Sequence, residues 1–297
     1  MIPLLTPAVK LYVGGHASRV QGEVLDLAGA RCFTAAHRPQ ICKLDVNEID
    51  GLLDSGAFSD APAERLTPEG ALERQLCWEK KASEKWGGDW KANALVSYDW
   101  LIDETWGPDG KVKRRWSLKD AETAVATTIS AAQYLASRRR DLWPRDLVLA
   151  CQGVGDLQYA ECVAEVLKVA TPEDWIGLGG WCILGRQTRW MPTFWRTLWR
   201  CLPQIAKAGI SRVHIFGVLY EPALAGLLWL ADEFGLRIST DSSAPILNCT
   251  WKDKKKAGVR VECGYWRCNV EWWVRHLAGL RQSRHYRRPP DLAPSLI

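Results

Sequence analysis

The chain has 297 residues, of which 47% are hydrophobic and 25% charged, and its formal net charge is +5. This composition is typical of a globular protein and excludes a fibrous or largely disordered chain. The length suits one (β/α)₈ barrel of about 250 residues with a short addition, or two smaller domains.

Segments typical of strands and of helices alternate along the chain, which is the pattern of a parallel sheet with helical connections. Thr67 followed by Pro68 is typical of a helix start, because proline suits the first helical position. Eight strands with intervening helices predict a closed (β/α)₈ TIM barrel over residues 1–245. The predicted strands are 9–13, 30–34, 50–54, 94–99, 147–153, 175–180, 212–217 and 236–241, and the predicted helices are 67–85, 118–140, 157–169, 193–208 and 222–234.

Polar residues and glycines stand at the carboxyl ends of six predicted strands. In (β/α)₈ barrels this end houses the chemistry, whereas the opposite end mostly contributes stability. We therefore expect the functional site at the carboxyl rim. The residues concerned are Asp54, Asp99, Gln152, Gly179 with Gly180, Gly217 and Asp241.

Two of these strand ends carry aspartates. Asp54 follows two leucines and precedes a Ser55-Gly56 turn that lets the backbone come close to a ligand, and Asp241 ends a short β-favouring run. Glycosidic bond cleavage uses such a pair of carboxylates: one attacks or stabilises the sugar carbon, and the other handles the leaving group's proton.

Residues 246–297 predict a C-terminal extension, with a hairpin over 250–262 and a helix over 269–281. Three thiolates and an imidazole within it form a complete tetrahedral zinc set, although buried cysteines and a surface histidine are the alternative. The candidate zinc ligands are Cys249, Cys263, Cys268 and His276.

The extension is also basic, and tryptophans elsewhere adjoin basic residues, as in Trp195-Arg196 and Trp199-Arg200. Interleaved aromatic and basic side chains suit a phosphate backbone with splayed bases, whereas the alternative places the tryptophans in the core and the arginines on a solvated face. The clustered arginines are Arg275, Arg281, Arg284, Arg287 and Arg288.

The longest apolar run, from Pro222 to Ala231, is about half a membrane span, and no basic segment followed by a long apolar one opens the chain. We therefore expect a cytoplasmic protein with no membrane partner. The ten cysteines are scattered, so we expect reduced thiols or metal ligands rather than disulfides.

With these residues in view, the chain resembles the tRNA-guanine transglycosylase superfamily, whose members exchange a guanine in nucleic acid for a 7-deazaguanine. The resemblance covers residues 50 to 245, with the motifs in the family's order. The motifs are Asp54-Ser55-Gly56-Ala57-Phe58, Ser97-Tyr98-Asp99, Gln152-Gly153, Gly179-Gly180, Phe216-Gly217 and Thr240-Asp241.

The resemblance implies that Asp54 is the general acid/base and Asp241 the nucleophile, and that no redox or nucleotide cofactor is needed. Guanine presents donors at N1 and N2 for a carboxylate, and acceptors at O6 and N7 for amide and backbone N–H groups. Aromatic rings on both faces replace the lost base stacking. The residues implied in substrate binding are Ser55, Gly56, Phe58, Asp99, Gln152, Gly179, Gly180 and Phe216.

The chain departs from the family's pattern at several positions. Ala57 replaces a glycine, Ser59 a glutamine, and Trp181 a small aliphatic residue that faces the 7-substituent in the family. A shorter chain with spread cysteines looks more like the DNA-modifying branch, so we expect DNA as the partner, with tRNA as the alternative.

The incoming base would be a 7-deazaguanine such as a cyano- or aminomethyl-deazaguanine, and homodimer formation stays open. Two other readings also remain. One is a catalytically silent nucleic-acid-binding partner subunit, and the other is an unrelated barrel hydrolase such as a glycosidase.

Overall fold

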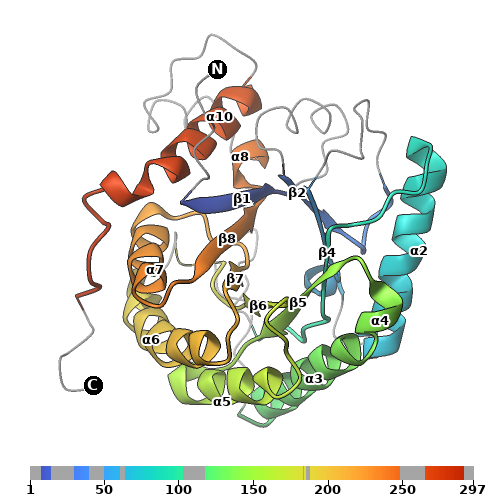
Figure 1. Cartoon of the computed structure of the whole chain (residues 1–297), viewed down its shortest axis with the longest axis horizontal. Helices are drawn as coiled ribbons and strands as arrows, with labels where there is room; N and C mark the ends of the chain where they lie inside the picture. Colours follow the sequence, from blue (N-terminus) through green and yellow to red (C-terminus); the bar gives the residue numbers. More distant parts are fainter. Residues whose placement is uncertain are drawn as a thin grey trace.

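The computed structural model describes residues 8–14, 30–39, 50–60, 64–102, 118–182, 184, 188–247 and 265–290. Within them, eight parallel strands close into a barrel in chain order, with β1 paired to β8 (Figure 1). This confirms the predicted (β/α)₈ fold. The strands are β1 Val9–Val13, β2 Ala30–Thr34, β3 Asp50–Asp54, β4 Ala94–Val96, β5 Asp146–Cys151, β6 Trp175–Leu178, β7 Arg212–Ile215 and β8 Arg237–Ser242.

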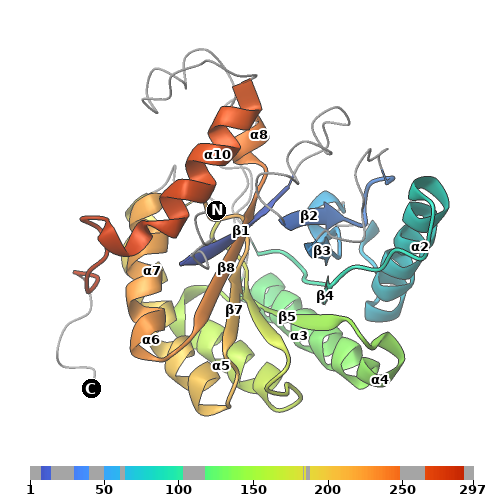
Figure 2. The same cartoon turned by 45° about the horizontal axis from the view of Figure 1, so that its top comes forward.

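Helices surround the barrel (Figures 1 and 2). The predicted helix over 118–140 is in fact two, because α3 ends at Ser137 and a short α4 follows. The helix α8 after β8 was not predicted. The helices are α2 Pro68–Trp86, α3 Leu118–Ser137, α4 Arg139–Leu142, α5 Gly155–Leu167, α6 Met191–Lys207, α7 Glu221–Glu233, α8 Ala244–Leu247 and α10 Tyr265–Ala278.

The core has two apolar layers, which follow from strand alternation and helix periodicity. Helix α6 buries Leu198, Leu202 and Ile205, which recur at intervals of three and four residues and so face the sheet together. Inside the barrel, alternate strand positions place Tyr12 and Leu52 in a separate buried cluster.

The start of α2 is the one expected from the sequence. The Thr67 hydroxyl accepts a hydrogen bond from the Gly70 amide at 3.1 Å, and Pro68 occupies the first helical position. Helix α2 is also tied to the barrel by a buried ion pair, in which Arg145 Nη2 lies 2.6 Å from Glu79 Oε2.

The described part of the C-terminal extension packs directly on the barrel. Val270 and Leu277 of α10 are fully buried in the same apolar cluster as the helices around the sheet, and α10 lies beside β1 and α8 in both views (Figures 1 and 2). Arg281 then forms a bidentate ion pair with Asp232 of α7, at 2.6 and 2.8 Å. Helix α10 begins four residues before the predicted start.

The predicted hairpin over 250–262 lies outside the described residues, as do Cys249, Cys263 and the side chain of Cys268. His276 is described: its Nε2 atom lies 3.1 Å from Glu221 Oε2, and its ring stacks on Trp272 at 4.5 Å. Within the described ranges, no group of three or more histidine, cysteine or acidic side chains is placed to hold a metal ion. No described helix is both long and apolar enough to cross a membrane.

Candidate active site

Asp54 is the last residue of β3, and the turn after it fixes one of its oxygens. Its Oδ2 atom accepts a hydrogen bond from the Gly56 amide at 3.0 Å. Gly56 has a φ of 85°, and a Cβ added there would lie 2.6 Å from the Ala36 nitrogen, so the turn requires glycine. This close approach explains the Ser-Gly pair after the strand.

The pKa of Asp54 is raised from 3.8 to about 6, mainly by burial. The Gly56 hydrogen bond opposes the shift, the negative charge of Asp241 adds to it, and the positive charge of Arg74 lowers the pKa. A carboxyl group with such a pKa can both give and take a proton near neutral pH.

Asp241 lies on β8 and is held by two donors on the neighbouring strand and its loop. Its Oδ1 atom accepts from the Gly217 amide at 2.9 Å and lies 3.2 Å from His214 Nε2. His214 is fully buried on β7, and its Nδ1 atom lies 2.9 Å from Ser239 Oγ. The amide and the imidazole therefore contact the same oxygen of Asp241.

Sequence analysis did not identify His214. It precedes Phe216 by two residues, so strand alternation places both side chains on the barrel's inner side, and it pairs in register with Ser239 of β8. That alternation was the signal available in the sequence.

The two aspartates stand on β3 and β8, which β1 and β2 separate in the closed sheet. The charge of Asp241 acts on Asp54, and both act on Cys32 of β2, whose pKa is raised by burial and then by the two carboxylates. The two predicted catalytic residues therefore share one site.

Three predicted base-binding residues also converge. A Cβ added at Gly179 would lie 3.7 Å from Asp99 Oδ2 and 3.9 Å from Phe216 Cδ2, so the carboxylate and the ring both border the backbone of this glycine. The next residue, Gly180, has a φ of 87°, which favours glycine. A flat ligand over Gly179 would meet a carboxylate and an aromatic ring.

Side-chain hydrogen bonds and an ion pair hold the loop after β3. The Ser55 carbonyl accepts a hydrogen bond from Arg74, which also pairs with Asp60 at 2.7 Å, and Asp60 accepts from the Tyr98 hydroxyl at 2.8 Å. Ser55 is fully buried, and its hydroxyl has no hydrogen-bond partner among the described residues. Phe58, in the following turn, is 66% exposed.

Gln152 is placed differently from the prediction. Its side-chain nitrogen donates to the Trp100 carbonyl and to Thr128 Oγ1, and its oxygen accepts from the Ile102 amide at 3.2 Å. Both amide hydrogens are therefore used within the protein. In this structure Gln152 holds the loop after β4, and its role in base binding stays a prediction.

Trp181 also departs from the expectation that its position faces the substrate. It is largely buried, and its ring packs against Phe194 at 5.1 Å and Tyr159 at 5.7 Å between the sheet and the helices.

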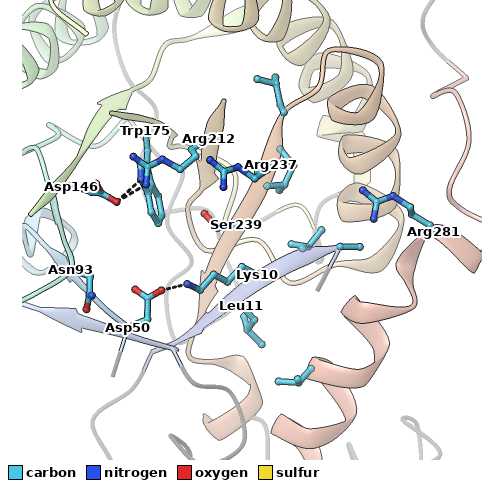
Figure 3. Close-up of a pocket in the computed structure, with 15 residues that line it drawn as sticks. Lys10, Leu11, Asp50, Asn93, Asp146, Trp175, Arg212, Arg237, Ser239 and Arg281 are labelled. Carbon is cyan, nitrogen blue, oxygen red and sulfur yellow. Dashed lines mark hydrogen bonds and ion pairs between the residues drawn. The ribbon is translucent and has the colours of Figure 1, made fainter. Parts of the chain in front are cut away.

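A cavity of about 740 Å³ lies at the opposite end of the barrel, among the first residues of the strands (Figure 3). Two ion pairs lie within it: Lys10 contacts Asp50, and Arg212 lies 2.5 Å from Asp146 (Figure 3). Cross-barrel ion pairs of this kind fit the end that mainly stabilises the fold.

The fold and the site together define a (β/α)₈ barrel with two carboxylates at the carboxyl ends of its strands. No protein-family profile matches the chain. No curated protein matches it in sequence either.

Solved structures with a similar chain path include the YdjI aldolase from Escherichia coli K12, with 9% identity over 92% of this chain and 90% of that one and a TM-score of 0.36. L-ribulose 3-epimerase has 13% identity over 92% of this chain and 98% of that one, with a TM-score of 0.39. At this identity the likeness does not bear on the reaction.

Proposed function

We propose that this protein is a transglycosylase that exchanges guanine in DNA for a 7-deazaguanine derivative. The observation that carries the proposal is that Asp54 and Asp241 lie at one barrel mouth, where the charge of Asp241 helps to raise the pKa of Asp54 to about 6. Carboxylates placed in unlike environments take unlike roles, one handling protons and the other staying charged.

In the proposed reaction, Asp241 attacks C1′ of the sugar as the bond to guanine breaks, and Asp54 supplies the proton that the departing base takes up. The product is a covalent ester between the sugar and Asp241. The incoming 7-deazaguanine then loses a proton to Asp54 and attacks the same carbon, which returns the electron pair to Asp241. Two displacements retain the configuration at C1′.

The base would lie over Gly179, with its N1 and N2 donors toward Asp99 and Phe216 at its side. Phe58 is exposed at the rim and can cover the other face, where stacking on an aromatic ring contributes about 1–3 kcal/mol per base. A guanine in a duplex must first be turned out of the helix, which costs a few kcal/mol.

The test is an exchange assay with labelled guanine, offered separately with DNA and with tRNA. We expect label in DNA with the wild-type protein, no label with Asp241→Asn, and unchanged labelling with the exposed control Asp89→Asn. Label in tRNA alone would make tRNA the substrate. Absence of label in both polymers, with the protein folded and bound to nucleic acid, would favour a silent binding subunit.

A barrel hydrolase that uses the same two acids is the second candidate, favoured by the same carboxylate pair. The two functions differ in how binding depends on salt. Affinity for nucleic acid falls steeply as salt rises, because binding releases counterions, whereas binding of a neutral sugar does not change. Salt-independent binding of free sugars would reject the transglycosylase.

A further inference from the structure

The two oxygens of Asp241 are not equivalent in this structure. Gly217 N and His214 Nε2 both approach Oδ1, at 2.9 and 3.2 Å, and no described donor is paired with Oδ2. Gly217 has a φ of 69°, and a Cβ there would lie 2.3 Å from Cys182 Sγ. The turn that holds this amide therefore requires glycine.

The surroundings of His214 fix which of its nitrogens carries a proton. An ionised Asp241 can only accept, so Nε2 must be the donor. The Ser239 hydroxyl has one hydrogen, and it lies 2.9 Å from His214 Nδ1 but 3.5 Å from the Val213 carbonyl. The shorter contact makes Ser239 the donor to Nδ1, which places the ring hydrogen on Nε2.

Packing holds the ring in that orientation. The Tyr12 ring lies 5.9 Å from it at an interplanar angle of 70°, and the Phe216 ring lies 4.7 Å away at 67°. The charged groups that act nearby are Asp241, in contact with Nε2, and Asp54, whose pKa the charge of Asp241 raises. With two edge-on rings and two hydrogen bonds, the imidazole cannot turn without breaking a contact.

We propose that His214, oriented by Ser239, positions Asp241 so that Oδ2 is the atom that bonds to the sugar and Oδ1 is the atom held by the protein. The inference rests on the proposed function for the identity of the electrophile. His214 acts through Asp241 and touches no reacting atom, so it is a positioning residue.

The arrangement suits both halves of an exchange. In the first half, the Oδ2–C1′ bond forms as the bond from C1′ to guanine breaks, and the electron pair leaves with the base. Oδ1 then becomes the carbonyl oxygen of the ester and keeps both N–H donors. In the second half these donors stabilise the charge that returns to Asp241 as Oδ2–C1′ breaks, as donors aimed at a developing oxyanion do.

The hydrogen bond itself is tested without any activity assay, by long-range ¹⁵N–¹H correlation spectra of the five histidines. The His214 signals are assigned by their loss in His214→Phe. We expect a protonated Nε2 and an unprotonated Nδ1 at pH 8, and a changed Nε2 shift in Asp241→Asn. An unprotonated Nε2 would overturn the inference, whatever the reaction is.

The positioning role is tested by the rate of covalent adduct formation with guanine-containing DNA in a single turnover. His214→Phe keeps the ring and removes the donor, so we expect a roughly 10- to 100-fold slower reaction with unchanged DNA affinity, as for loss of a hydrogen bond to a charged group. His214→Gln places an uncharged N–H at a similar reach and should recover most of the rate. Ser239→Ala should lie between them.

An adduct that forms as fast in His214→Phe as in the wild type would reject the positioning role. Failure of the wild type to form any adduct with DNA or tRNA would instead reject the proposed function. In that case the spectra still decide whether His214 holds Oδ1 of Asp241. If His214→Phe does not fold, the rates of His214→Gln and Ser239→Ala supply the same comparison with the wild type.

Discussion

Asp54 and Asp241 lie at the ends of β3 and β8, close enough that the charge of Asp241 raises the pKa of Asp54. The two carboxylates are held differently. One oxygen of Asp54 takes a single amide from its own turn, whereas one oxygen of Asp241 takes an amide and an imidazole from β7 and its loop. Under the proposed function, this difference makes Asp54 the proton carrier and Asp241 the nucleophile.

The raised pKa of Asp54 predicts a pH-dependent effect of Asp54→Asn on stability. A carboxyl whose pKa rises from 3.8 to about 6 stabilises the folded state fully below about pH 4, and this contribution is lost as pH rises through 6. We expect Asp54→Asn to raise the free energy of unfolding by about 1–3 kcal/mol at pH 8 and to leave it unchanged at pH 4. Urea denaturation at both pH values measures the difference.

The exposed Asp89 supplies the control, since Asp89→Asn should follow the wild-type stability at both pH values. An Asp54→Asn protein that is less stable than the wild type at pH 8 would show that Asp54 is held as a favourable buried charge.

The same pKa predicts the pH profile of the first chemical step. Asp54 must be protonated to donate a proton to the leaving base. The rate of adduct formation should therefore be constant below about pH 6 and fall tenfold per pH unit above it. Single-turnover rates between pH 5 and 8 test this. A flat profile across that range would remove Asp54 from the proton transfer.

Arg74 offers a way to move that profile. Its positive charge lowers the pKa of Asp54, so Arg74→Met should shift the midpoint of the rate profile to higher pH. The variant also removes the Arg74 contacts to the Ser55 carbonyl and to Asp60. Because these contacts hold the turn that carries Phe58, we expect the affinity for the base to fall roughly tenfold. Arg140→Met, at an exposed position, should change neither quantity; a midpoint that moves to lower pH would contradict the assigned electrostatics.

A substitution of Gln152 tests whether this side chain stabilises the fold or recognises the base. Gln152→Ala removes three internal hydrogen bonds and should lower the free energy of unfolding by about 1–3 kcal/mol. The exposed Gln133 on α3 is the matched control, and Gln133→Ala should have little effect. Unchanged stability together with lost guanine binding would restore the base-reading role that the sequence motif predicted.

The barrel and the place of the two aspartates at its carboxyl rim could be predicted from the sequence because both depend on local patterns. Each strand is a short β-favouring run, and Asp54 and Asp241 stand where those runs end, so parallel pairing alone brings them to one mouth. Gly179 could be placed at the same rim for the same reason.

The side-chain partners could not be predicted in this way, because they depend on contacts between strands and loops far apart in the chain. Gln152 was assigned from its motif, yet its amide is used by Trp100, Ile102 and Thr128, up to 52 positions away. His214 was missed in the sequence, because its partner Asp241 lies 27 positions away and no motif marks the pair.

The most direct test of the account is the intact mass of the protein after denaturing a reaction with a guanine-containing DNA oligonucleotide in the absence of incoming base. We predict a covalent adduct of protein and oligonucleotide that has lost guanine, located at Asp241 by peptide mapping and missing in Asp241→Asn. An adduct that persists in Asp241→Asn, or exchange of guanine with no adduct in the wild type, would contradict Asp241 as the nucleophile.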